Sequence, residues 1–183
     1  IKSLRIYEKI GEKSGIAHSL THLGNVYEVR GEYAKALEYN KRALKICEKL
    51  DDKYGIAFNL SNIGMIYNYQ NSYEKAKKYL EKSLIIQKDI SVDEGYLVLY
   101  NTCTLYIIYK NFKKEYSDDK INKLIKTTDD SDFKLNYSLY ILLEQEYYLK
   151  KAYEEIKEKI SAMEEELEQK FLSYPIPKAI VEE

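Results

Sequence analysis

The sequence repeats itself at a spacing of 40 residues, and this self-similarity restricts the fold more than any other feature. The segment Leu23–Tyr27 (LGNVY) overlays Ile63–Tyr67 (IGMIY) after a shift of 40 positions. The register continues along the chain, so that Tyr33 falls on Tyr73. A period of this length is typical of stacked repeats, in which one unit cannot bury its apolar face alone. The chain is therefore expected to be a repeat array.

Each repeat has the pattern of two helices. Apolar residues recur at the spacing of one helical face over residues 14–30 and again over residues 33–50. Gly31 lies between these two stretches, and glycine commonly ends helices because it adopts the left-handed conformation without strain. In the next repeat Asn71, which also tolerates that conformation, takes the place of Gly31. The sequence predicts a pair of antiparallel helices for each repeat.

Glycine recurs inside the first helix of each repeat, at Gly24 and Gly64. A glycine in a helix interior costs about 1 kcal/mol relative to alanine. Its recurrence at the same phase indicates that the paired helix approaches closely at this point. We expect Ala36 and Ala76 to be the small residues that face the two glycines.

The repeat register divides the chain into segments. They are residues 1–12, the second helix of a truncated preceding repeat; full repeats at 13–52 and 53–92; a degenerate repeat at 93–132; a terminal helix pair at 133–174; and a proline-containing tail at 175–183. Because the chain opens within a repeat, we expect it to be part of a longer array. The predicted fold class is all-α, an α-solenoid of antiparallel helix pairs with a degenerate C-terminal unit and a long terminal helix that ends near Leu172.

Composition excludes several classes of protein. The chain has 29 basic and 30 acidic residues, so a basic surface for nucleic acid or for a charged membrane is not expected. Apolar runs fall short of the roughly 18–20 residues that span a bilayer. Cys47 and Cys103 fit no metal or redox motif and are interpreted as free thiols, which favours a cytoplasmic location.

The sequence carries no motif for catalysis or for a cofactor. A glycine-rich phosphate loop, a nucleophile elbow and a dinucleotide fingerprint are all absent. His18 and His22 lie four residues apart, a spacing that places two imidazoles on one helix face and can hold a metal. No motif offers further ligands, so groove or packing histidines are favoured over an adventitious or a true metal site. We predict no enzymatic activity, no cofactor and no metal.

These residues resemble the tetratricopeptide repeat. The first repeat matches its pattern with Leu20, Leu23, Gly24, Tyr27, Ala36, Tyr39 and Ala43, and the second with Leu60, Ile63, Gly64, Tyr67, Ala76, Tyr79 and Ser83. The 40-residue period is similar to the longer-helix subclass found in kinesin light chains and in bacterial multi-domain signalling proteins. The resemblance implies a superhelix in which Leu23, Gly24, Tyr27, Ala36, Ile63, Gly64, Tyr67 and Ala76 pack the repeats.

In that family the first helices line a concave groove that binds segments of partner proteins. The resemblance implies that the groove positions are His18, Thr21, Asn25, Glu28, Phe58, Ser61, Met65, Asn68, Tyr69, Asn101, Leu105 and Tyr109. Asn25 is the expected hydrogen-bonding partner of a peptide backbone, and Phe58, Met65, Tyr69 and Tyr109 are the expected apolar anchors. The alternative for each position is packing against a neighbouring repeat.

The chaperone-binding branch of the family grips a terminal carboxylate with lysine and arginine side chains. The corresponding positions here hold Thr21, Val98 and Thr102, none of which is basic. The resemblance therefore implies that acidic C-terminal tails are not ligands of this chain.

Three functions remain open from the sequence. The first is a non-catalytic scaffold that binds a partner protein, a peptide or a neighbouring domain of the same chain in the groove. The second is the regulatory region of a larger bacterial signalling enzyme of the cyclase or kinase type, because residues 164–183 resemble the end of repeat regions in such proteins. The third is self-association through the truncated N-terminal helix, whose apolar face carries Leu4, either Ile6 or Tyr7, and Ile10.

Overall fold

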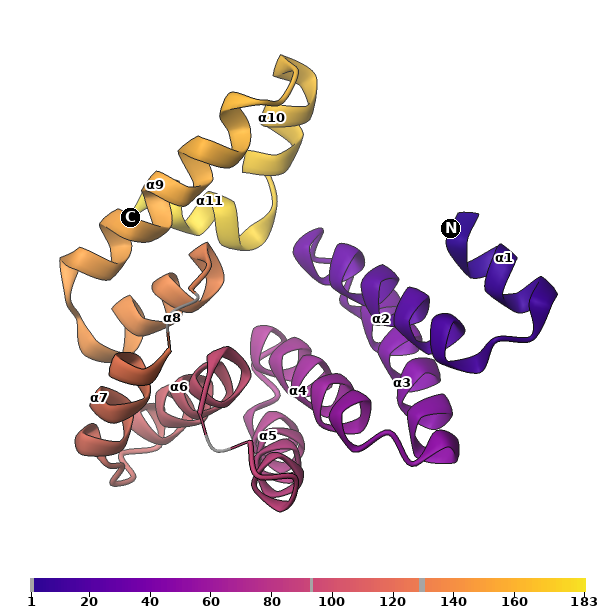
Figure 1. Ribbon diagram of the computed structural model, residues 1–183. Coiled ribbons are helices and arrows are strands. Elements are labelled where there is room, and N and C mark those ends of the chain that lie inside the picture. Colours follow the sequence, from indigo (N-terminus) through magenta and orange to yellow (C-terminus); the bar gives the residue numbers. More distant parts are fainter. Residues whose placement is uncertain (1, 93, 129–130) are drawn as a thin grey trace. The chain divides into compact units, whose positions relative to one another are not determined.

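The computed structural model describes residues 2–92, 94–128 and 131–183, and the parts of the chain that it describes form helices and no strands (Figure 1). The fold is all-α and has the hairpin architecture of a helical repeat solenoid. Two compact units make up the chain. Unit 1 comprises residues 1–28 and 32–93, and unit 2 comprises residues 29–31 and 94–183.

Unit 1 contains the two complete helix hairpins. Its helices are α1 (Lys2–Ile10), α2 (Lys13–Val29), α3 (Tyr33–Leu50), α4 (Lys53–Tyr69) and α5 (Tyr73–Asp89). Figure 1 shows α2 beside α3 and α4 beside α5. Gly31 and Asn71, which join the helices of each pair, have φ values of 74° and 56°. The left-handed turns predicted from the sequence at these two residues are therefore confirmed.

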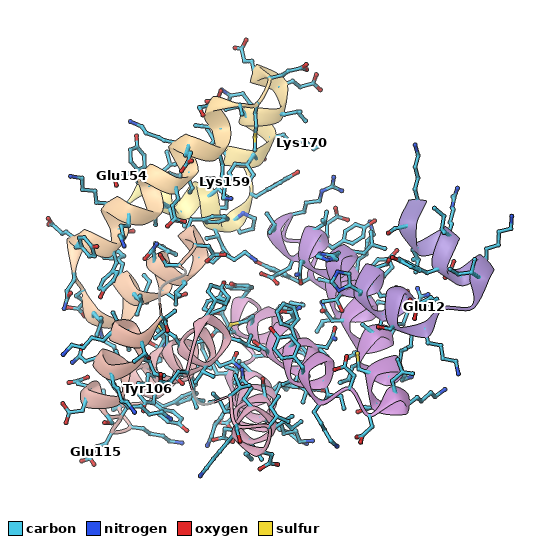
Figure 2. The ribbon with its side chains drawn as sticks, in the orientation of Figure 1. Glu12, Tyr106, Glu115, Glu154, Lys159 and Lys170 are labelled. Atoms are coloured by element: carbon cyan, nitrogen blue, oxygen red, sulfur yellow. The ribbon has the colours of Figure 1, made fainter. Side chains whose placement is uncertain are left out.

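The first helices of both hairpins begin with a carboxylate cap. The side chain of Asp52 accepts a hydrogen bond of 2.9 Å from the backbone N–H of Gly55 at the start of α4. Glu12, at the turn between α1 and α2 (Figure 2), accepts from Ser14 at 2.8 Å and also from Gly15. Each carboxylate satisfies N–H groups that a helix leaves unpaired at its N-terminus.

Close packing of α4 on α5 depends on Gly64. A Cβ atom at this position would lie 2.8 Å from Cγ of Leu80 and 3.3 Å from its backbone nitrogen. At the equivalent position of the first hairpin, a Cβ on Gly24 would collide with the side-chain amide of Asn40. The close helix approach expected from the sequence is present in both hairpins.

The residues that face the glycines differ from those expected. Ala36 and Ala76 are fully buried, but the side chains opposite Gly24 and Gly64 belong to residues one helical turn further along, Asn40 and Leu80. The offset arises because the turn between the two helices sets which residue of the second helix lies opposite the glycine of the first. The sequence pattern identifies small residues but does not reveal how the two antiparallel helices are aligned.

A tyrosine pair also repeats in unit 1. The rings of Tyr27 and Tyr39 stack at 5.4 Å between centroids, and those of Tyr67 and Tyr79 stack at 5.6 Å. Stacked aromatic pairs are worth about 0.5–1.5 kcal/mol beyond the area that they bury. Because each pair joins the first helix of a hairpin to the second, the stacking stabilises the same helix contact as the glycine.

Unit 2 keeps helices but loses the repeat register. Its helices are α6 (Tyr96–Asn111), α7 (Asp118–Thr127), α8 (Phe133–Leu143), α9 (Glu146–Ser161), α10 (Glu165–Leu172) and α11 (Pro175–Glu182). Gly95 lies 40 residues after Gly55, which is inside α4. Gly95 instead precedes α6 with a φ of 99°, so α6 begins later than the 40-residue register would place it.

The C-terminal part differs from the expected long helix and tail. The helix expected to reach Leu172 is interrupted, because α9 ends at Ser161 and Glu164 has an extended backbone before α10. The residues expected to form a proline-containing tail fold into α11, whose first residue is Pro175. Proline suits the first turn of a helix because its missing N–H is not needed there.

The packing of α11 explains why the C-terminal residues are ordered as a helix. Ile180 is buried in a cluster with Phe133, Ala152 and Ile156, so α11 packs on α8 and α9. Burial of one isoleucine side chain contributes about 1.5–3 kcal/mol. The apolar spacing of the sequence continues across the break after α9, which is why the sequence alone suggested one long helix.

Replacing Gly64 with alanine is expected to destabilise unit 1. The added Cβ would overpack against Leu80, at a cost of about 1–3 kcal/mol, and the better helix propensity of alanine offsets about 1 kcal/mol of it. We expect Gly64→Ala to lower the free energy of unfolding by about 1 kcal/mol in urea titrations followed by circular dichroism. The exposed Lys78→Ala is the control, and a Gly64→Ala protein as stable as wild type would contradict the packing role.

Candidate functional site

A hollow of about 300 Å³ lies between α2 and α4 in unit 1. We refer to it as the α2–α4 hollow. Its lining consists of Ser14, Ala17, His18, Thr21, His22 and Asn25 from α2, with Cys47 of α3, the α4 cap Asp52, and Tyr54, Gly55, Phe58 and Asn59 of α4. This is the first-helix surface on which the sequence predicted a binding groove.

The structure brings only some of the expected groove residues together. His18, Thr21, Asn25 and Phe58 all line the α2–α4 hollow. Of the remaining predicted positions, Glu28, Ser61, Met65, Asn101 and Leu105 are buried, and Asn68, Tyr69 and Tyr109 are half-buried. Their part in binding stays a prediction, and the four residues in the hollow carry the candidate site.

Thr21 and Asn59 join the two walls of the hollow. The hydroxyl of Thr21 lies 3.0 Å from both Oδ1 of Asn59 and the backbone oxygen of Ala17, and it donates to these acceptors. Nδ2 of Asn59 donates to the backbone oxygen of Gly55 at 2.8 Å and lies 3.9 Å from Sγ of Cys47. The side chain of Asn59 is thus held in place by three helices.

A second polar bridge lies directly behind the hollow. Nδ2 of Asn62 donates to Oδ1 of Asn25 at 2.8 Å and to Oδ1 of Asn40 at 3.0 Å. Asn40 is completely buried and donates in turn to the backbone oxygen of Ala36 at 2.9 Å. The amide oxygen of Asn25 therefore takes part in packing between the repeats, and the expected hydrogen bond from Asn25 to a peptide backbone stays a prediction.

His18 and His22 form an exposed pair at the rim of the hollow. Their Nε2 atoms are 2.8 Å apart and the rings meet edge to face at 4.3 Å between centroids. One imidazole donates and the other accepts, according to their tautomers. Within the described residues no cluster of three or more histidine, cysteine or acidic side chains is placed to hold a metal ion.

Asp52 is the one carboxylate of the lining, and no lysine or arginine contributes to it. Cys47 is 3% exposed, and burial together with the nearby carboxylate of Asp52 raises the pKa of its thiol to about 11. The thiol is therefore neutral at physiological pH. Cys103 of unit 2 is completely buried, which also raises its pKa, and both cysteines are free thiols.

An aromatic pair forms one side of the hollow. The rings of Tyr54 and Phe58, one turn apart on α4, stack at 6.4 Å between centroids with an interplanar angle of 25°. Tyr54 is 58% exposed, so its ring is open to a ligand. The lining thus combines aromatic faces, amide and hydroxyl groups and one carboxylate.

Another hollow, of about 330 Å³, lies on the other side of the histidine pair. Ser3 and Tyr7 of α1 face Ser19, Leu23 and Val26 of α2 there, and His18 and His22 contribute to both hollows. The histidine pair is therefore a ridge between two depressions of unit 1.

Asp52, Tyr54 and Asn59 belong to the site but were not among the residues predicted from the sequence. The cap residue Asp52 and Tyr54 precede the groove positions inferred from the family. Asn59 lies beside Phe58, on the side of α4 that meets the preceding repeat. Asn59 takes the place of Ser19 in the preceding repeat, so the repeat pattern does not single it out.

Comparison with known families gives one match. The model of the tetratricopeptide repeat family matches residues 15–89, which cover nearly all of α2 to α5 and less than half of the chain. The match supports a tetratricopeptide-repeat protein and is confined to the two complete hairpins. No curated protein matches the sequence. In the described part of the chain, no helix combines the length and the apolar character that a membrane span needs.

Removing the amide of Asn62 should destabilise the junction between the two repeats. Asn62→Ala takes the donor away from Asn25 and leaves the buried Oδ1 of Asn40 without it, which costs about 1–3 kcal/mol. We expect this loss in the free energy of unfolding measured with urea. Asn122→Ala, at an exposed position of α7, is the control and should stay within about 0.5 kcal/mol of wild type. An equal effect of the two substitutions would show that the bridge contributes nothing.

Proposed function

We propose that unit 1 is a protein-interaction module that binds a segment of a partner protein in the α2–α4 hollow. Tetratricopeptide repeats are generally protein-interaction modules, and the family match covers both helices that form the hollow. The single observation that carries the proposal is this open depression, with the exposed ring of Tyr54 and the exposed pair of His18 and His22 at its edge.

The chemistry of the lining favours binding over catalysis. Cys47 is held as a neutral thiol, a weak nucleophile, and its hydrogen-bonding neighbours are amides and the Asp52 carboxylate. The side chains of Thr21 and Asn59 hydrogen-bond each other. We infer a non-catalytic scaffold, and the two free thiols favour a reducing compartment such as the cytoplasm.

Two groove substitutions and one distant substitution test the proposal. The bait is the full-length protein, used as wild type and with Phe58→Ala, His18→Ala or Lys78→Ala. Partners that bind the hollow should be captured by wild type and by Lys78→Ala, and should be lost or weakened at least about tenfold by Phe58→Ala. If each captured protein binds all four baits equally, the hollow is not the binding site.

Peptides that end in Glu-Glu-Val-Asp are expected not to bind. The lining contains no lysine or arginine to pair with their carboxylates, and Asp52 repels them. A fluorescence anisotropy titration with a labelled peptide of this sequence should give no saturation in the micromolar range. Micromolar binding that Phe58→Ala abolishes would contradict the prediction.

A regulatory region of a larger signalling enzyme is the second candidate, and the two functions are compatible. It is supported only by the resemblance of residues 164–183 to the ends of such repeat regions. A cyclase, kinase or ATP-binding region in the full-length reading frame would support it. Self-association through α1 remains a third proposal, because Ile6 and Ile10 are exposed. It would be dismissed if Leu4→Glu left the mass measured by light scattering unchanged.

A further inference from the structure

The charge of the α2–α4 hollow favours a positively charged ligand group. Asp52 is the one carboxylate of the lining, which contains no lysine or arginine, and Cys47 beside it is a neutral thiol. The Asp52 carboxylate accepts hydrogen bonds from the N–H of Gly55 and from the thiol of Cys47. A carboxylate accepts about four hydrogen bonds, so it retains capacity for a donor from a ligand.

Two neutral polar side chains of the hollow, Asn59 and Thr21, present acceptors. The two Nδ2 hydrogens of Asn59 point to Gly55 and to Cys47, and its Oδ1 accepts from Thr21, which leaves one further lone pair on Oδ1. The hydroxyl hydrogen of Thr21 is directed to Asn59 and Ala17, so its oxygen presents lone pairs. A ligand rich in N–H groups therefore matches this wall of the hollow.

The aromatic wall suits the same kind of ligand. Tyr54 and Phe58 stack with their rings nearly parallel, and Tyr54 is largely exposed. Aromatic faces attract ammonium and guanidinium groups, and a guanidinium also stacks on them. The aliphatic stem of a long basic side chain can lie along the rings while its charged end reaches the carboxylate.

We propose that the α2–α4 hollow binds an arginine or lysine side chain of the partner segment, with Asp52 pairing with its charge and the Tyr54–Phe58 pair covering its stem. The volume of about 300 Å³ is at the small end of ligand pockets, which suits one long side chain. The inference rests on the function proposed above and adds the chemistry of the partner. It also distinguishes this hollow from a site for acidic peptides.

Three short peptides that differ in one residue test the proposal. They are acetyl-Gly-Gly-X-Gly-Gly-amide with X as arginine, as citrulline, which has the shape of arginine without its charge, or as glutamate. Each is titrated to millimolar concentration into the ¹⁵N-labelled protein, and amide shifts are followed by NMR. The arginine peptide should shift the resonances of Gly55, Phe58 and Asn59. It should bind about threefold or more tightly than the citrulline peptide, and the difference should shrink as salt is added.

Two matched variants assign the preference to one carboxylate. Asp52→Asn removes the charge but keeps a good N-cap for α4, and it should weaken the arginine peptide about threefold while leaving the citrulline peptide unchanged. Asp51→Asn makes the same substitution at an exposed neighbour that pairs with Lys53 at 2.7 Å and lies outside the lining. Asparagine tolerates the left-handed conformation of residue 51, so this control should fold and bind as wild type does.

The results separate this inference from the proposed function. Any one of four results would overturn the preference for a cation. They are equal affinities for the arginine and citrulline peptides, tighter binding of the glutamate peptide, equal effects of the two variants, and the absence of shifts with every peptide. If partners sensitive to Phe58→Ala are nevertheless captured, the hollow remains a binding site and only its assigned chemistry is wrong. If no partner depends on Phe58, the proposed function fails whatever the peptides show.

Discussion

In each complete hairpin the second helix packs where the first helix has no Cβ atom. At Gly64 the space that a side chain would occupy is taken by Leu80, and at Gly24 it is taken by Asn40. The contact at Gly24 is linked to the candidate site. The Asn40 side chain that lies against Gly24 also accepts a hydrogen bond from Asn62 of the next hairpin, and Asn62 donates as well to Asn25 of the hollow. A change that separates α2 from α3 would therefore also disturb the contact between α2 and α4.

The α2–α4 hollow is held open by buried amides. Asn62 is bonded to Asn25 and Asn40, and Asn59 is bonded to Thr21. These contacts join α2 to α4, and three of the side chains that form them line the hollow. A polar junction of this kind is costly if any member loses its partner, which favours one arrangement of the two helices over others. The hollow thus rests on a hydrogen-bonded base, and such preorganisation would lower the entropy lost by a ligand that binds there.

The sequence predicted the features that recur and missed those that depend on how the elements pair. The 40-residue register identified the hairpins, and Gly31 and Asn71 marked their turns. The sequence did not show that Leu80 rather than Ala76 faces Gly64. Which residues of two antiparallel helices lie opposite each other depends on the three-dimensional geometry of the turn that joins them. The resemblance to the family, by contrast, correctly pointed to Phe58 as a residue of the hollow.

Other parts of the site and fold lie outside any repeating pattern. Asp52 reaches the hollow from a helix cap, a position that helix periodicity does not describe. In the C-terminal unit the apolar spacing runs through the break after Ser161, so periodicity could not locate it. The buried position of Ile180 comes from tertiary packing alone.

The difference between Asn40 and Leu80 has a consequence for how such an array can evolve. The two residues occupy the same position of successive repeats, yet one is polar and bonded to the next hairpin while the other is apolar. Repeat genes grow and shrink by copying units, and copies are useful only if they fit any neighbour. If the second hairpin were duplicated, the first copy would place a leucine next to the asparagine of the second copy. That asparagine would then lack an acceptor for its hydrogen bond. The hydrogen bond between Asn62 and Asn40 thus favours the present order of the two hairpins, and an exchange between them would lose it.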